Sequence, residues 1–295
     1  SSIKVDSGKK IEGTSANQVA IGQRNTITAN AADMKLINEG TIKLDGNKST
    51  GIAGETGTIE NKGIINVNGV ESTGLYGADG SVITNDTAGK INIGSKGAGI
   101  LAQNDLDGTL KTTGKITVEN KGDITANSNG VKTIGIYADN TSTIAGFDNH
   151  VTKENAVVNN RASMNFGDDS IGIFAKKSTI NLTGTGSDDI STDNNGLGVY
   201  AKDSTVNLLT NYGFKIKNNG VGMYLEDTDT STGNVEVKYA GANTARGTGI
   251  YLSGTLPMTN KLNVNVKNTT GSNGGMIGIY ASGADLTNEG DIKIE

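Results

Sequence analysis

Apolar and polar residues alternate in short stretches along the whole chain, and turn residues separate these stretches. In one stretch, Ile171, Ile173 and Ala175 fall on one face of an extended chain. Gly172 and Phe174 fall on the opposite face. A period of two residues predicts a half-buried strand whose isoleucine face is turned toward a core.

Two further strands are predicted before this pattern returns. After a turn at Lys176 and Lys177, the chain alternates again and directs Ile180 and Leu182 inward. Turn residues follow, and a poorer third strand begins at Ile190. One unit of the pattern is therefore about three short strands joined by turns.

This unit belongs to a repeat that extends along the chain. Its most regular part is a glycine followed by an aliphatic residue, then usually an aromatic and then usually a small residue. The steps between successive copies run from 23 to 37 residues. The nine glycines that begin the copies are Gly51, Gly74, Gly99, Gly135, Gly172, Gly198, Gly222, Gly249 and Gly278. A repeat of this length predicts stacked units, each of which buries its apolar face only against its neighbours.

A second motif marks the turn before the third strand. Glycine follows two residues after Asn38, Asn61, Asn120 and Asn288. We interpret the motif as a tight turn in which the glycine has a positive φ. Three strands per coil, stacked in parallel, predict an all-β fold, a right-handed parallel β-helix (solenoid) of about 10 coils. An ordinary β-sandwich is the alternative, and the regular parallel-type repetition argues against it.

The repeat predicts a single domain over residues 1–295. Residues 1–37 are expected to hold degenerate coils, in which Val19-Ala-Ile-Gly is a worn copy of the glycine motif. Residues 38–295 carry the regular repeats. Two steps exceed the typical spacing by about ten residues, which predicts insertions near residues 103–113 and 141–165.

Composition narrows the classes of function. Hydrophobic residues make up 34% of the chain and aromatic residues 4%, without tryptophan, which suits a thin core. The net charge is −5 and no lysine or arginine run occurs, so we expect no nucleic-acid partner and no anionic membrane partner. Cysteine is absent, which excludes disulfides and thiolate metal sites.

Strands of the Gly-Ile-Tyr-Ala type alternate here with Ser-Thr-Ile-Asn-Leu and Asn-Lys-Gly-Ile-Ile-Asn-Val segments. Together they resemble the passenger domains of type Va autotransporters, over about residues 38–295. The asparagine- and lysine-rich style is most similar to that of the very large fusobacterial outer-membrane adhesins. The resemblance implies a right-handed β-helix that is secreted and displayed on the bacterial cell surface. It also implies a parent protein anchored in the outer membrane by a C-terminal barrel, of which this chain would be an excised passenger piece.

The same resemblance implies adhesion, either to host cells as part of virulence or to partner bacteria in coaggregation. The implied partner is a protein or glycan receptor on a host or bacterial cell surface. We expect the segment to be a monomer. A passive stalk that spaces an adhesive tip from the cell is the alternative, because one fold serves both functions.

The residue two positions after each motif glycine is expected to point outward. These residues are Tyr76, Tyr137, Phe174, Tyr200, Tyr224, Tyr251 and Tyr280, with Leu101 in the same row. One interpretation is a strip that binds a protein or a glycan, because tyrosine gives rigid amphipathic contact area. The other is a stacking ladder that stabilises neighbouring coils.

The second predicted insertion supplies further candidate binding residues. It contains Phe147, the only histidine of the chain (His150), Lys153 and Arg161. Insertions on a solenoid project from one face and often bind partners. An extra strand or a tolerated loop is the alternative interpretation.

Acidic residues offer an enzymatic alternative, a β-helix polysaccharide lyase or glycoside hydrolase that uses paired carboxylates. The clusters are Asp168 and Asp169, then Asp188, Asp189 and Asp193, then Glu226, Asp227 and Asp229. Aspartate is common in turns, tryptophan is missing and basic residues are scarce near the acids. The acidic stretch around Asp105 does not match a calcium loop, because glycine stands at its twelfth position. We therefore expect no enzymatic activity, no metal and no cofactor.

Overall fold

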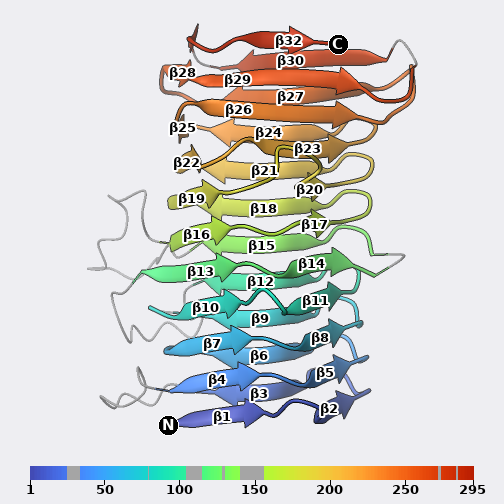
Figure 1. Cartoon of the computed structure of the whole chain (residues 1–295), viewed down its shortest axis with the longest axis vertical. Coiled ribbons are helices and arrows are strands. Elements are labelled where there is room, and N and C mark those ends of the chain that lie inside the picture. The colour runs from blue at the N-terminus through green and yellow to red at the C-terminus, as the bar shows by residue number, and fades with distance from the viewer. Residues whose placement is uncertain are drawn as a thin grey trace.

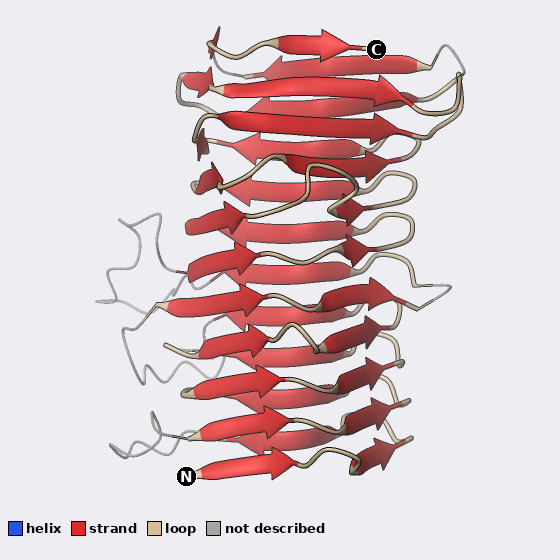
Figure 2. Ribbon diagram, in the orientation of Figure 1, coloured by secondary structure: helices blue, strands red, loops and turns tan. Residues whose placement is uncertain are grey.

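The computed structural model of the chain describes residues 1–24, 34–78, 80–103, 115–127, 130–139, 156–271, 274–283 and 285–295. Within these ranges every regular element is a β-strand, and the strands stack into a tall, narrow rod (Figure 1, Figure 2). Three long parallel sheets, named A, B and C below, form its sides. The predicted fold class, an all-β parallel solenoid with three strands per coil, is confirmed.

Sheet A has nine strands, each paired in parallel with the next. They are β1 (Ser2–Val5), β4 (Lys35–Asn38), β7 (Thr58–Asn61), β10 (Val82–Asn85), β13 (Ile116–Asn120), β16 (Ala156–Asn160), β19 (Ser178–Leu182), β22 (Thr205–Leu208) and β25 (Asp229–Thr230). Above them, β28 (Met258–Asn260) and β31 (Leu286–Asn288) form a separate parallel pair.

Sheet B has eleven strands and follows sheet A within each coil. They are β2 (Lys10–Gly13), β5 (Thr41–Leu44), β8 (Ile64–Val67), β11 (Lys90–Ile93), β14 (Asp123–Ala126), β17 (Met164–Asn165), β20 (Ile190–Ser191), β23 (Tyr212–Ile216), β26 (Gly233–Tyr239), β29 (Leu262–Asn268) and β32 (Ile292–Ile294). The poor third strand expected at Ile190 is the two-residue β20.

Sheet C has ten strands and carries the glycine motif. They are β3 (Val19–Gln23), β6 (Thr50–Gly54), β9 (Thr73–Gly77), β12 (Ala98–Gln103), β15 (Ile134–Asp139), β18 (Ile171–Lys176), β21 (Leu197–Lys202), β24 (Val221–Glu226), β27 (Arg246–Ser253) and β30 (Gly275–Ser282).

One strand from each sheet makes one coil, and the coils rise as a right-handed helix. In Figure 1 the strands of sheets A and B run from left to right in front, and those of sheet C return behind them while the chain climbs. The ten strands of sheet C lie nine turns apart from first to last. At a strand spacing of about 4.8 Å, ten coils make a rod roughly 50 Å long.

The core is a set of aliphatic columns, because parallel register places the same position of each coil above its predecessor. Ile65, Ile91 and Ile124 of sheet B are in register and fully buried. Ile173 and Ile180, which the alternation directs inward, are also fully buried. Burying each such side chain contributes about 1.5–3 kcal/mol, so the columns hold the rod together along its whole length.

The motif glycines of sheet C interrupt the alternation. Gly172 is buried next to buried Ile173, whereas Ile171 is only half-buried, so the predicted faces of Ile171 and Gly172 are wrong. The equivalent Gly74 shows the reason. A Cβ there would lie 2.6 Å from the carbonyl oxygen of Gly99 and 2.6 Å from a methyl group of Ile91. The glycines therefore turn inward and leave room for the core column of sheet B.

A buried asparagine ladder fills the corner between sheets A and B. Each amide Nδ2 donates to the Oδ1 of the next asparagine, at distances of 2.9, 2.9, 3.0 and 2.7 Å. Its members, all fully buried, are Asn38, Asn61, Asn85, Asn120 and Asn160. The last member donates to the hydroxyl of Tyr212 at 2.8 Å. Because buried amides are costly without partners, this ladder makes a polar corner compatible with the core.

The glycine of the Asn-x-Gly motif has a different role from the predicted one. Gly40, Gly63, Gly122 and Gly290 do not have a positive φ. A Cβ at Gly63 would collide with the carbonyl oxygen of Gly40 in the preceding coil, so close approach of stacked backbones selects glycine. Non-glycine residues with a positive φ occur elsewhere. Lys177, Asp203 and Asp227 follow strands of sheet C, and Asp188 lies between β19 and β20. The others lie in the turns before sheet C, and they are Asn17, Lys48, Glu71, Lys96, Lys132, Asp169, Asn195 and Asn219.

The first described residues already follow the coil pattern. The strands β1, β2 and β3 pair with β4, β5 and β6, and Ile21 of the worn motif is in register with Ile52. Residues 104–114 and 140–155 lie outside the described ranges, and most of both predicted insertions falls there. Residues 156–165, assigned by the sequence to the second insertion, hold the regular strands β16 and β17.

Introducing a charge into a core column is expected to unfold the surrounding coils. Ile173→Asp and Ile136→Asp each place a carboxyl group without a partner at a fully buried position. Tyr200→Ser, in the neighbouring outward row, removes ring contacts worth about 0.5–1.5 kcal/mol per pair and should be tolerated far better. Urea denaturation followed by circular dichroism measures the difference. Equal losses in the two classes would contradict the inward and outward assignments.

Removing one rung of the asparagine ladder should be far more harmful than removing an outer amide. Asn120→Ala leaves the Nδ2 of Asn85 without its acceptor and the Oδ1 of Asn160 without its donor. Two buried unpaired groups are expected to lower the free energy of unfolding by about 2–6 kcal/mol. The control is Asn92→Ala on the outer face of sheet B, where the loss should stay near 1 kcal/mol. The same denaturation measurement compares them, and similar losses would show that the buried ladder has no special weight.

Candidate functional site

The aromatic residues of the glycine motif form one continuous column on the outer face of sheet C. Neighbouring ring centroids lie 4.9, 4.9, 5.3, 4.5 and 4.9 Å apart along the column. In chain order its members are Tyr137, Phe174, Tyr200, Tyr224, Tyr251 and Tyr280. We call this set the aromatic column. Tyr76 is in register with the column but is separated from it by Leu101.

The rings present their edges to solvent. The Tyr137 and Phe174 rings are nearly parallel, with an interplanar angle of 3°, so each ring covers the face of its neighbour. Five rings of the column are half-buried, and only Tyr280 at one end is exposed, at 46%. A partner on this side would therefore contact ring edges and hydroxyl groups. The column also stabilises the stacking of coils, as aromatic pairs do between neighbouring strands.

Two parallel rows flank the aromatic column on the same face. An aliphatic row three residues before the rings consists of half-buried Ile134, Ile171, Leu197 and Val221. A polar row two residues after the rings consists of Asp139, Lys176, Lys202, Glu226, Ser253 and Ser282. The face thus changes across its width from apolar to charged.

The polar row is tied to the rings by hydrogen bonds and charge. The Tyr200 hydroxyl donates to Glu226 at 2.8 Å, and Lys202 Nζ donates to the other carboxylate oxygen at 2.6 Å. The bond from Lys202 and that from Tyr200 hold the pKa of Glu226 below 4.5, its ordinary value. Burial, and then the bond to Glu226, raise the pKa of the Tyr200 hydroxyl, which stays protonated at neutral pH. Lys176 lies 5.4 Å from the ring centre of Phe174.

The candidates from the second insertion are separated from this face. Phe147, His150 and Lys153 lie outside the described residues. Arg161 is described, and it is an exposed residue in the turn between β16 and β17. Its backbone N–H donates to the carbonyl of Asn120 at 2.8 Å. Arg161 therefore belongs to the corner between sheets A and B, on a different side of the rod from the aromatic column.

The acidic clusters have structural partners. Asp168 accepts from the backbone N–H of Asn194 at 2.9 Å, and Asp227 accepts from those of Thr255 and Leu256 at 2.9 and 3.0 Å. Asp193 pairs with Lys217 at 2.6 Å. These bonds hold turns between coils. Among the residues that the structure describes, no group of three or more histidine, cysteine or acidic side chains is placed to bind a metal ion.

Two features of these surfaces were missed from the sequence. The aliphatic row was missed because strict alternation placed Ile171 in the core. Tyr212 and Tyr239, the two tyrosines outside the motif, are fully buried rather than displayed. The sequence did hold a signal for Tyr212. In the coil after Asn160, leucine takes the place of the ladder asparagine, because Asn160 is in register with Leu182. Asn160 therefore needs another acceptor, and the Tyr212 hydroxyl provides it.

Comparisons of the chain with protein-family models, with curated proteins and with solved structures found no match. Over the described ranges, the structure contains no helix with the length and hydrophobicity needed to cross a membrane. The function is therefore inferred below from the residues on the surface of the rod.

Stability should depend on pH through Glu226. A pKa below its ordinary value in the folded state means that Glu226 stabilises the fold above about pH 4.5, and that this contribution is lost as the pH falls through the folded-state pKa. Glu226→Gln should be less stable than the unaltered protein at neutral pH, by about 1 kcal/mol for a partly exposed pair. Below the folded-state pKa the two proteins should become equal. Urea denaturation across this pH range tests it, and a constant difference would contradict the assigned ion pair.

Proposed function

We propose that this chain is a β-helical passenger segment of a bacterial autotransporter adhesin, displayed on the cell surface. Its function is attachment to host cells or to other bacteria through a protein or glycan receptor. The observation that carries the proposal is the aromatic column, which gives a rigid rod one long, half-exposed face. Such a face offers contact area that needs little ordering on binding.

The chemistry of sheet C also fits a recognition surface. Tyrosine hydroxyls and ring edges lie between an aliphatic row and a charged row, so one partner can meet apolar and polar groups together. Aromatic residues with this mixed character are enriched among the residues that dominate binding energy. The rigidity of the stacked coils keeps the rows in fixed register.

A passive stalk is the second candidate, and one observation favours it. The ring faces of the aromatic column are covered by one another, with 3° and 12° between the planes of the first two pairs. Rings that stack face against face stabilise the rod, and they leave less of their surface exposed to a receptor. A rod of this kind would hold an adhesive part of the parent protein away from the cell.

Binding of the labelled, purified chain to epithelial cells and to partner bacteria, measured by flow cytometry, distinguishes the two functions. The test variant combines Tyr137→Ser, Tyr200→Ser and Tyr251→Ser. If the aromatic column binds the receptor, the unaltered chain should bind saturably and the variant should bind at least about tenfold more weakly.

The matched control replaces apolar residues on the outer face of sheet A. Val82→Ser and Val157→Ser remove outward side chains at one register position of that sheet and should leave cell binding unchanged. Circular dichroism verifies that all variants are folded. Absence of saturable binding by the unaltered chain would make the segment a stalk. Equal binding by the test and control variants would exclude the aromatic column as the contact.

A further inference from the structure

In a repeat protein, a feature that one coil has and the other coils lack is not required for stacking. The clearest such feature is the turn of residues 183–189, which connects β19 to β20 with seven residues. No other turn between consecutive strands of sheets A and B in the described ranges has more than four residues. We call this turn the wall loop, because it stands beside the outer face of sheet B.

The wall loop is held by bonds from within and from a distant coil. Asp189 is only 4% exposed, and its carboxylate accepts from the backbone N–H groups of Thr185, Gly186 and Gly213 at 2.8, 3.1 and 2.8 Å. Lys238, two coils further along sheet B, donates to Ser187 Oγ at 2.6 Å and pairs with Asp188 at 3.1 Å. The loop is therefore fixed against sheet B at both its base and its tip.

The strand beneath the wall loop is adapted to it. A Cβ at Gly213 would lie 2.6 Å from the backbone of Ser187, so only glycine lets the loop lie this close. The next residue toward the N-terminus is Tyr212, whose hydroxyl ends the buried asparagine ladder. The departures from the repeat are thus concentrated in one place.

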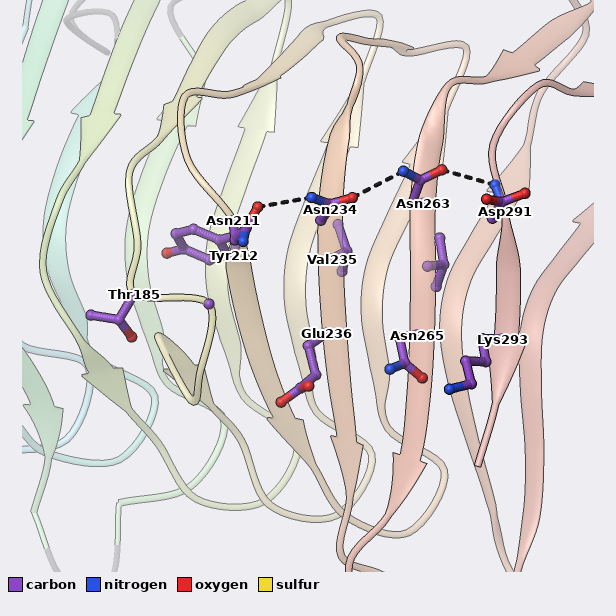
Figure 3. A pocket seen from close by; sticks show the side chains of 12 residues that line it. Thr185, Asn211, Tyr212, Asn234, Val235, Glu236, Asn263, Asn265, Asp291 and Lys293 are labelled. Atoms are coloured by element: carbon purple, nitrogen blue, oxygen red, sulfur yellow. Dashed lines mark hydrogen bonds between the residues drawn. The ribbon is translucent and has the colours of Figure 1, made fainter.

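Beside the wall loop lies a groove of about 410 Å³ along the outer face of sheet B. Figure 3 shows Thr185 of the loop on one side, and a row of amides that crosses neighbouring strands. In that row, Asn234 donates to Asn211 at 3.0 Å and Asn263 donates to Asn234 at 2.9 Å. A second row of the groove contains Glu236, Asn265 and Lys293. Both rows run parallel to the axis of the rod, one residue per coil.

The lining disfavours two classes of ligand. The lining carries the carboxylates of Glu236 and Asp291, and its lysine, Lys293, pairs with Glu295, so a polyanion gains little here. The strands β23, β26 and β29 are each paired on both edges, so none of these three offers an open edge to an extended peptide. A ligand must instead hydrogen-bond to amides and charged side chains.

One acceptor in the groove lacks a donor. The Oδ1 of Asn265 is buried and receives no hydrogen bond among the described residues, whereas its Nδ2 donates to Glu295 at 3.3 Å. Buried acceptors normally have a partner, so the Asn265 amide, which lines the groove, has hydrogen-bonding capacity that the described residues leave unused. Amide, carboxylate and ammonium groups in fixed positions suit a ligand with many hydroxyl groups and no charge.

We propose that this groove binds an uncharged, linear oligosaccharide that lies along the rod with one sugar per coil. The amide row repeats at the strand spacing of about 4.8 Å, which is close to the length of one sugar in an extended β-1,4-linked chain. The inference rests on the proposed attachment function, and it names a glycan as the receptor class. It assigns glycan binding to sheet B, a second surface besides the aromatic column of sheet C.

Isothermal titration of the full chain with cellopentaose and with chitopentaose tests the groove directly. Saturable binding of either sugar is expected. The test variant combines Asn234→Leu and Asn263→Leu, which remove two exposed amides of the groove, and it should bind at least about tenfold more weakly. The matched control combines Asn66→Leu and Asn92→Leu, an amide pair on the same face of sheet B in coils that have no wall loop. The control should bind like the unaltered chain.

Three results would overturn the groove assignment. They are no saturable binding of either sugar, equal weakening by the test and control variants, and tighter binding of polygalacturonate than of the neutral sugars. Cell binding measured on the same proteins separates this inference from the attachment function. Cell binding without oligosaccharide binding would overturn the groove and leave attachment standing. Oligosaccharide binding without cell binding would support the groove and contradict attachment.

Discussion

Parallel stacking at a spacing of about 4.8 Å is the constraint on which the rest of this structure depends. In its most regular columns, a side chain has a similar side chain above or below it at this distance. Only residues that pack well against their own kind can occupy such columns. Isoleucine does so in the core, asparagine in the buried corner, aromatic rings on sheet C, and glycine wherever two backbones come closest.

The same constraint explains how a chain with few aromatic residues and one proline forms a stable rod. Each coil contributes only a few buried side chains, but each of them is packed on both sides. Polar residues become useful inside the rod because a column of amides satisfies its own hydrogen bonds. The bonds of Glu226 join side chains at the surface, whereas those of Asn120 belong to a buried row that passes through several coils.

Repetition made most of the fold predictable from the sequence. The glycine motif located sheet C, and the alternation at Ile180 and Leu182 located the core of sheet A. The sequence could not show that Gly172 turns inward, because that direction depends on a side chain of sheet B from elsewhere in the coil. It also could not reveal the groove, because Thr185, Asn234 and Asn263 meet only through stacking of coils far apart in the chain. The turn residues of the wall loop were visible, but their distant bond to Lys238 was not.

The asparagine rows have one more consequence, which concerns dipoles. In the buried ladder each amide donates toward the C-terminal end of the rod, as Asn61 does to Asn85. In the asparagine rows of the outer faces, the amides donate to an asparagine nearer the N-terminal end, as Asn92 does to Asn66 and Asn263 does to Asn234. Aligned amide dipoles add along a row, so inner and outer rows produce opposing fields. In the coils through which both rows run, the dipoles of the asparagine side chains therefore oppose one another.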